Sequence, residues 1–97
     1  MKKPFVRIAE DGSTTFIDGD KLANLQAAVG GYITSAPITR EGFIPGNTTA
    51  YANDEGILLG MRRNALASVV CGYPLFGPVV IRATAKVLSV LELEAPK

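Results

Sequence analysis

Apolar residues recur at helical spacing in two stretches of this chain. In residues 21–29 the apolar positions that share one helical face are Leu22, Leu25 and Val29. This spacing predicts a short amphipathic helix, and the preceding segment 18–20 (DGD) offers N-cap chemistry. Gly30 then predicts a left-handed C-cap, and Gly31 lets the chain turn sharply into a strand. The alternative for Gly31 is that it lets a ligand approach the backbone closely.

The second helical stretch follows Asn64, a residue type that caps helix N-termini. The apolar positions of its stripe are Leu66, Val69 and Val70. Gly72 is predicted to end this helix, and Cys71 lies in its last turn. A single cysteine in a chain without histidine favours a small core residue over a nucleophile.

Residues 4–9 and 14–17 are rich in β-branched and aromatic side chains and flank a turn-forming segment, 10–13. This arrangement predicts an N-terminal β-hairpin. The side chains expected to supply its buried face are Phe5, Val6, Ile8, Phe16 and Ile17. Apolar residues occupy both faces of the hairpin, so the pattern leaves its register open.

Three further strands are predicted in the middle of the chain, at residues 32–38, 48–52 and 57–59. The last two flank an NDEG sequence typical of a type I turn. They are therefore expected to form a second hairpin, in which Tyr51 and Leu58 lie on paired strands.

From Val79 onward apolar and polar residues alternate, which predicts one long strand or two shorter ones. A helix over 83–94 is the alternative, because Val87, Leu88 and Leu91 also share a helical face. An apolar strand at the chain terminus would invite pairing with a second subunit, so a homodimer or higher homo-oligomer is expected. Together the elements predict a single α+β domain over residues 1–97, a mostly antiparallel sheet with two short helices packed on one face.

The composition argues against several classes of function. The 97 residues carry a net charge of +1, with ten basic and nine acidic side chains dispersed along the chain, which argues against a nucleic-acid partner. The chain has no histidine, the commonest general base and metal ligand, and it contains no nucleophile elbow, phosphate loop or metal motif. We therefore expect no enzymatic activity, no catalytic residue, no metal and no cofactor. No signal-peptide or membrane-spanning run is evident, so a cytoplasmic protein is expected.

Five residues are candidates for binding a small anionic ligand. Arg62 and Arg63 precede the predicted helix N-terminus at Asn64, where guanidinium groups and backbone donors could together hold an anion. Tyr32 and Asn53 complete the predicted set. Surface solvation of the arginines and ordinary turn chemistry at Asn53 are the alternatives.

Two smaller features also have open interpretations. In the predicted loop 40–47, Phe43 and Ile44 either pack back onto the core or contact a partner. Asp54 and Glu55, next to Asn53, could form a polar cluster for a ligand or cation.

Four motifs resemble a family of small phage and mobile-element proteins catalogued as a domain of unknown function. They are residues 25–33 (LQAAVGGYI), 51–56 (YANDEG), 64–67 (NALA) and 77–81 (GPVVI). The chain departs from that pattern at Thr34, where the family often has an acidic residue, and from Ala83 onward. The resemblance implies a phage or plasmid protein in a bacterial cytoplasm, and it implies no catalytic residue.

With this context we expect a non-enzymatic binding protein that acts on the host, by capturing a small molecule or by masking a host protein. The first alternative is a small structural or assembly protein that oligomerises through its C-terminal strand. The second is an enzyme that works without histidine.

Overall fold

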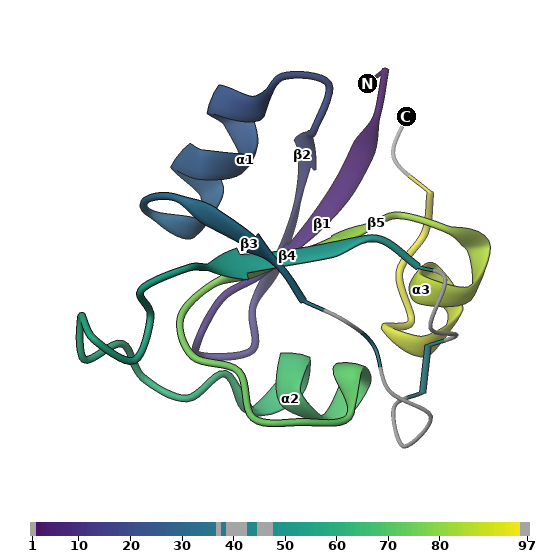
Figure 1. Cartoon of the computed structure of the whole chain (residues 1–97). Helices are drawn as coiled ribbons and strands as arrows, with labels where there is room; N and C mark the ends of the chain where they lie inside the picture. The colour runs from purple at the N-terminus through teal and green to yellow at the C-terminus, as the bar shows by residue number, and fades with distance from the viewer. Residues whose placement is uncertain (1, 37, 39–42, 45–47, 96–97) are drawn as a thin grey trace.

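The computed structural model of the chain describes residues 2–36, 38, 43–44 and 48–95. Within these residues, five strands form one antiparallel sheet in the order β2-β1-β5-β4-β3 (Figure 1). The strands are β1 (Pro4–Ile8), β2 (Thr14–Asp18), β3 (Ile33–Ser35), β4 (Ala50–Asn53) and β5 (Val79–Arg82). The helices are α1 (Leu22–Val29), α2 (Ala65–Cys71) and α3 (Ala85–Val90). The predicted α+β class with an antiparallel sheet is confirmed.

β1 and β2 form the predicted N-terminal hairpin, in a register that pairs Pro4 with Asp18. β1 also pairs along its other side with β5, where Val6 lies opposite Ile81. β1 is thus an interior strand covered on both faces, so apolar residues are needed on both. This explains why the sequence pattern alone could not fix the register.

The helices pack on both faces of the sheet, so the expectation that they share one face is wrong. Phe5 and Val80 face α1, where they pack in one cluster with Leu25 and Val29. The neighbouring strand positions point the other way and pack against α2 and α3. The strand residues of this second cluster include Val6, Ile8, Val79 and Ile81. Figure 1 shows α1 and α2 on opposite sides of the sheet.

The C-terminal segment is a short strand followed by a helix, so the prediction of continuing strand structure is wrong beyond Arg82. Thr84 caps α3, because its side-chain oxygen accepts a hydrogen bond from the backbone N–H of Val87 at 3.2 Å. Val87 is fully buried, while Leu88 and Leu91 pack partly buried against the same cluster. The helical spacing of these three residues therefore prevails over the alternating pattern. The expected pairing of subunits through a C-terminal strand loses its structural basis.

The predicted second hairpin is also wrong, because residues 57–59 lie in turns and not in a strand. β4 pairs with β3 on one side and β5 on the other, so it has no open edge for a further strand. Residues 54–60 instead form successive turns, in which the backbone N–H of Leu59 donates to the carbonyl of Glu55 at 2.8 Å. The side chain of Leu58 is 84% exposed.

Both predicted glycine stops are observed at the helix ends. Gly30 ends α1 with φ of 79°, and Gly72 ends α2 with φ of 92°, both in the left-handed region that favours glycine. The start of α1 differs from the prediction. Its N-cap is Lys21 without a side-chain hydrogen bond, because the Asp18 carboxylate accepts from the backbone N–H groups of Lys3 and Asp20 instead.

β3 is shorter than the predicted strand over 32–38, and Pro37 lies outside the described residues. Most of the predicted loop 40–47 also lies outside them, except Phe43 and Ile44. Ile44 is buried in the core and Phe43 is 61% exposed, so the two take different environments. Within the described ranges, none of the helices is long and apolar enough to cross a membrane.

Candidate functional site

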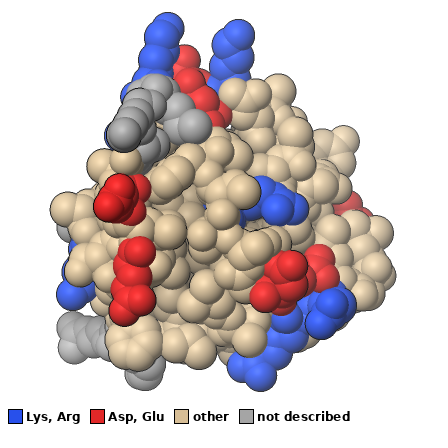
Figure 2. All heavy atoms as spheres, turned by 180° about the vertical axis from the view of Figure 1, so that it is seen from behind, with Lys and Arg blue, Asp and Glu red and all other residues tan. Residues whose placement is uncertain are grey.

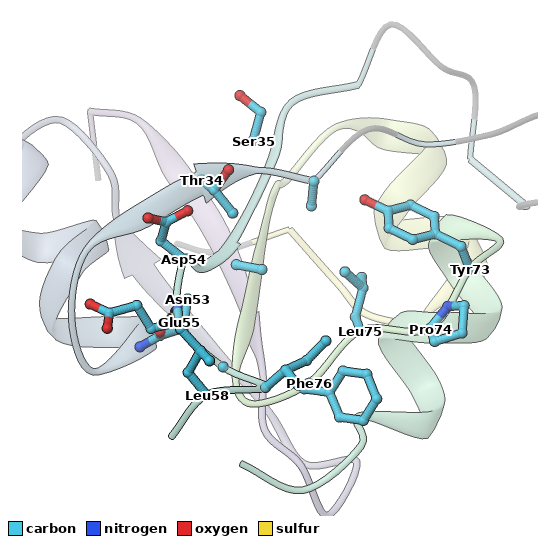
Figure 3. A pocket seen from close by; sticks show the side chains of 14 residues that line it. Thr34, Ser35, Asn53, Asp54, Glu55, Leu58, Tyr73, Pro74, Leu75 and Phe76 are labelled. Atoms are coloured by element: carbon cyan, nitrogen blue, oxygen red, sulfur yellow. Dashed lines mark hydrogen bonds between the residues drawn. The ribbon is translucent and has the colours of Figure 1, made fainter. Parts of the chain in front are cut away.

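A groove opens on the sheet face that carries α2, above β3 and β4. Its volume is about 300 Å³. One wall is the turn at 54–58 and the other is the segment 73–76 that follows α2. Figure 3 shows Thr34, Asp54 and Glu55 on one side of this β3–β4 groove and Tyr73 and Pro74 on the other.

The floor of the groove is made of small side chains. Ala36 and Ala52 are buried members of the core cluster on this face, and both line the groove. On β5, whose Val79 pairs with Ala52, the same face carries larger residues, Val79 and Ile81. A methyl group fills less of the space above a strand than a Val or Ile side chain, so the two alanines leave room for the groove although both are buried.

The charged groups of the groove lie at its rim. Asp54 and Glu55 are exposed, and none of the described residues that line the groove is lysine or arginine. Burial raises the pKa of the Tyr73 hydroxyl, with a smaller contribution from Cys71. A tyrosine hydroxyl is protonated at neutral pH in any case, and it is able to donate a hydrogen bond. The rim therefore suits a ligand with a positive charge and an apolar part.

Asn53, one of the predicted ligand-binding residues, connects α1 to β4. Its side-chain amide donates to the carbonyl of Val29 at 3.0 Å, and its side-chain oxygen accepts from the N–H of Glu55 at 2.8 Å. A Cβ on Gly31 would lie 3.1 Å from this amide nitrogen. The close approach at Gly31 is thus made by Asn53 of the same chain, which accounts for this glycine without a ligand.

Asn64 is fully buried and uses its side chain within the protein. Its amide group donates to the carbonyls of Ile8 at 2.9 Å and Gly77 at 3.0 Å. Its side-chain oxygen accepts from the N–H of Ala67 at 3.0 Å, which caps α2 as predicted. These contacts occupy both donors and the capping acceptor, so the group joins three segments of the fold.

The other predicted binding residues are exposed and do not gather around one cavity. Tyr32 is 71% exposed, and its backbone carbonyl accepts from the N–H of Asp54 at 2.9 Å. Arg63 pairs with Phe76 through an isolated β-bridge. Hydrogen bonds from Ser13 lower the pKa of the Asp11 carboxyl, and the charge of Arg62 adds a small effect in the same direction. The combined anion site stays a prediction.

Charge is distributed over the surface without a single-sign patch on the face seen in Figure 2, where basic and acidic side chains are interspersed among uncharged residues. Cys71, as predicted, is a core residue on the inner side of α2. Burial raises the pKa of its thiol to about 11. The thiolate that a nucleophile requires is therefore scarce at neutral pH.

The least expected feature is an aliphatic tip on the 54–60 turns, formed by Ile57, Leu58 and Leu59. Their exposed fractions are 74%, 84% and 60%. Ile57 and Leu58 also line the β3–β4 groove. A second hollow shares Tyr73 and Pro74 with the groove and is lined in part by Phe43 and Val69, both exposed.

Sequence reasoning missed both the groove and the tip. The groove lining comes from three segments far apart in the chain, 34–36, 52–58 and 73–76, so no local motif could show it. The tip did carry a signal, because three aliphatic residues follow a turn sequence directly. Their composition predicts a strand, because strand propensity does not distinguish an exposed turn from an edge strand.

Comparisons of the chain with protein-family models, with curated proteins and with solved structures give no significant match. The resemblance to small phage and mobile-element proteins therefore stays a prediction. The interpretation of the site depends on its own geometry.

Proposed function

We propose that this chain is a non-enzymatic binding domain that captures a protein partner on the β3–β4 groove and the aliphatic tip. The observation that carries the proposal is the exposure of Ile57, Leu58 and Leu59 beside a groove with an alanine floor. Contiguous apolar surface of this kind on a soluble domain is typical of protein interaction sites. The absence of histidine from the sequence supports a binding role over acid–base catalysis.

The energy available at this surface is large enough for specific binding. Burying one fully exposed leucine or isoleucine side chain contributes about 1.5–3 kcal/mol. A tip of three such residues next to a concave surface is therefore able to provide the small cluster of anchors that dominates most protein interfaces. Tyr73 adds an aromatic side chain to the same surface.

The groove favours a protein over the small anion expected from Arg62 and Arg63. Neither arginine lines it, and its charged groups are the carboxylates of Asp54 and Glu55. If the resemblance to mobile-element proteins holds, the partner is a host protein in the bacterial cytoplasm, and the domain acts by masking it. Self-association into a homo-oligomer through the same surface is the competing proposal.

The test compares Leu58→Asp with Leu22→Asp, a matched control. Leu22 is also exposed, at 59%, but it lies on α1 and outside the groove. Immobilised wild-type protein and both variants are incubated with bacterial lysate, and the retained proteins are quantified by mass spectrometry. We expect a protein that is retained by the wild type and by Leu22→Asp and is lost with Leu58→Asp.

The candidate partner is then purified and titrated calorimetrically against the three proteins. Loss of an anchor residue predicts a Kd at least about 30-fold weaker for Leu58→Asp, corresponding to about 2 kcal/mol. Equal binding by both variants would contradict the proposed site. A nucleotide-sized adduct in native mass spectrometry, lost in Arg62→Ala/Arg63→Ala, would favour the small-ligand alternative instead.

A further inference from the structure

Among the described residues, β3 is the last strand of the sheet, and one side of its backbone has no neighbouring strand there. The N–H of Ala36 donates to the carbonyl of Ala50 at 2.9 Å, and the N–H of Asp54 donates to the carbonyl of Tyr32 at 2.9 Å. Pairing therefore uses the backbone groups of residues 32, 34 and 36, because hydrogen-bonded positions alternate along an antiparallel strand. The N–H and C=O groups of Ile33 and Ser35 point to the open edge, and no partner for them lies among the described residues.

Within the three residues of β3, neither a charged side chain nor a proline guards the edge against strand addition, although its shortness limits the length of pairing. Proteins commonly guard an edge strand with a charged side chain or a proline within it. β3 contains only Ile33, Thr34 and Ser35, and its two hydroxyl residues are exposed. The edge is thus a template for pairing with another extended segment.

The open edge and the groove are continuous. Thr34, Ser35 and Ala36 line the groove as well as the edge of the sheet. In a strand added alongside β3, every second side chain would point to the groove face, since side chains alternate between the faces. One such side chain would lie over the floor formed by Ala36 and Ala52.

The charges at the groove rim indicate which side chain the added strand would carry at its next groove-facing position. Asp54 pairs with Tyr32 at the other end of the β3–β4 ladder, and Asp54 and Glu55 are both exposed at the groove rim. An added strand lies about 10 Å from β4, two strand spacings away, a distance that lysine and arginine side chains are long enough to bridge for the most part. With no lysine or arginine among the described residues that line the groove, these carboxylates are available to a cation of the occupant.

We propose that the occupant is an extended segment of the partner protein that adds to the β3 edge, with an aliphatic side chain over the alanine floor and a lysine or arginine two residues away facing Asp54 and Glu55. This inference rests on the proposed function and specifies its partner. Backbone pairing supplies affinity, and the two alternate side chains supply specificity.

The experiment uses a displayed library of random ten-residue peptides, selected against the full chain. We expect the enriched peptides to share an aliphatic residue and a lysine or arginine at a spacing of two. The best peptide is then synthesised, together with its Lys/Arg→Gln analogue, and their Kd values are measured by fluorescence anisotropy.

Ser35→Pro tests the edge. Proline at this position removes a donor that β4 does not use, so the fold is retained while pairing at the edge is blocked. Thr14→Pro is the matched control. Thr14 is the first residue of β2, the edge strand at the other end of the sheet. The N–H of Gly19 donates to the carbonyl of Lys3, and the N–H of Ala9 donates to that of Ser13, so the odd-numbered residues of β2 pair with β1. Because paired positions alternate, the N–H of Thr14 points away from β1. We expect Ser35→Pro to weaken peptide binding at least about tenfold and Thr14→Pro to leave it unchanged.

Asp54→Asn/Glu55→Gln tests the charge. This variant should weaken binding of the basic peptide at least about threefold and should bind the peptide and its glutamine analogue equally, because exposed ion pairs contribute modestly to binding. Asp20→Asn/Glu94→Gln removes the same charge at exposed positions outside the groove and should have no effect. Urea unfolding of every variant checks that the fold is retained.

In the peptide experiments, three results would overturn the inference: no enriched peptide, enriched peptides without a basic residue, or equal binding by Ser35→Pro and Thr14→Pro. A wild-type dimer that dissociates in Ser35→Pro would also overturn it, because the edge would then belong to a second copy of this chain. If a partner protein is lost with Leu58→Asp but retained by Ser35→Pro, the strand-addition inference fails while the proposed function stands. If neither variant affects binding, both fail.

Discussion

Replacing Asn64 with alanine should destabilise the protein much more than the loss of a helix cap alone. The substitution removes the acceptor for the Ala67 N–H, which corresponds to about 1 kcal/mol for an N-cap. It also leaves the buried carbonyls of Ile8 and Gly77 without the donors that they have now, at a cost of at least about 1 kcal/mol each. We therefore expect a loss of about 3 kcal/mol from a domain whose size predicts a total stability of roughly 5–15 kcal/mol.

Urea unfolding, followed by circular dichroism, measures this loss. With an m value of about 1.5 kcal/mol/M, the midpoint should fall by roughly 2 M while m stays constant. Thr84→Ala is the matched control, because Thr84 caps α3 through its side-chain oxygen and has no further side-chain hydrogen bond among the described residues. It should lose about 1 kcal/mol.

Asn64→Asp further separates the contribution of the helix cap from that of the two amide N–H donors. The carboxylate keeps the capping acceptor but turns an oxygen toward the two carbonyls that now receive hydrogen bonds. It should therefore be at least as destabilising as Asn64→Ala at pH 7. If Asn64→Ala lost no more than Thr84→Ala, the amide donors would contribute nothing, and the assignment of Asn64 as a buried structural connection would be refuted.

Three further predictions concern other parts of the fold. Gly56→Ala places a Cβ 2.8 Å from the carbonyl oxygen of Phe76, so it should cost about 1–3 kcal/mol in urea unfolding; an unchanged midpoint would contradict the packing of the 54–60 turns. Cys71 should react with iodoacetamide much more slowly in the folded protein than in urea at pH 8, because its thiol is buried and its pKa is raised to about 11; equal rates would mean that the thiol is accessible. A hydrogen bond from the Asp20 N–H, and weaker ones from other backbone N–H groups, lower the pKa of the Asp18 carboxyl in the folded state. Its carboxylate therefore stabilises the fold at pH values above the unfolded-state pKa of about 4. This stabilisation is lost as the pH falls further. The stability difference between wild type and Asp18→Asn should accordingly be present at pH 7 and shrink progressively as the pH falls below about 4, and a pH-independent difference would contradict this role.

The sequence predicted well the features that depend on neighbouring residues. A cap at Asn64 and a left-handed stop at Gly30 are set within one helical turn, and the N-terminal hairpin is set by a short turn between two strands. In each case the interaction that fixes the structure lies within a few residues, so the local pattern contains it.

The failures are features that depend on distant segments. Whether residues 57–59 join a sheet depends on an open edge beside β4, and β3 and β5 already occupy both edges. The face on which α1 packs depends on which strands flank β1. An interior strand buries its side chains on both faces, so the local pattern does not show which face a helix covers. Ile57 and Leu58 have the composition of a strand, but only the folded arrangement shows that they border a groove.

The groove reduces the stability that the fold could reach, and the open edge and the aliphatic tip reduce its resistance to aggregation. A larger side chain at Ala36 or Ala52 would fill space beside Leu75, at a gain of about 0.8 kcal/mol for each CH₂ group buried. A charged residue in β3 would protect its edge, and polar residues in place of Leu58 and its neighbours would improve solubility. The three features form one continuous surface, because Thr34 and Ser35 of the edge and Ile57 and Leu58 of the tip also line the groove. A partner that needs an apolar floor, a strand to pair with and aliphatic anchors requires all three in one place.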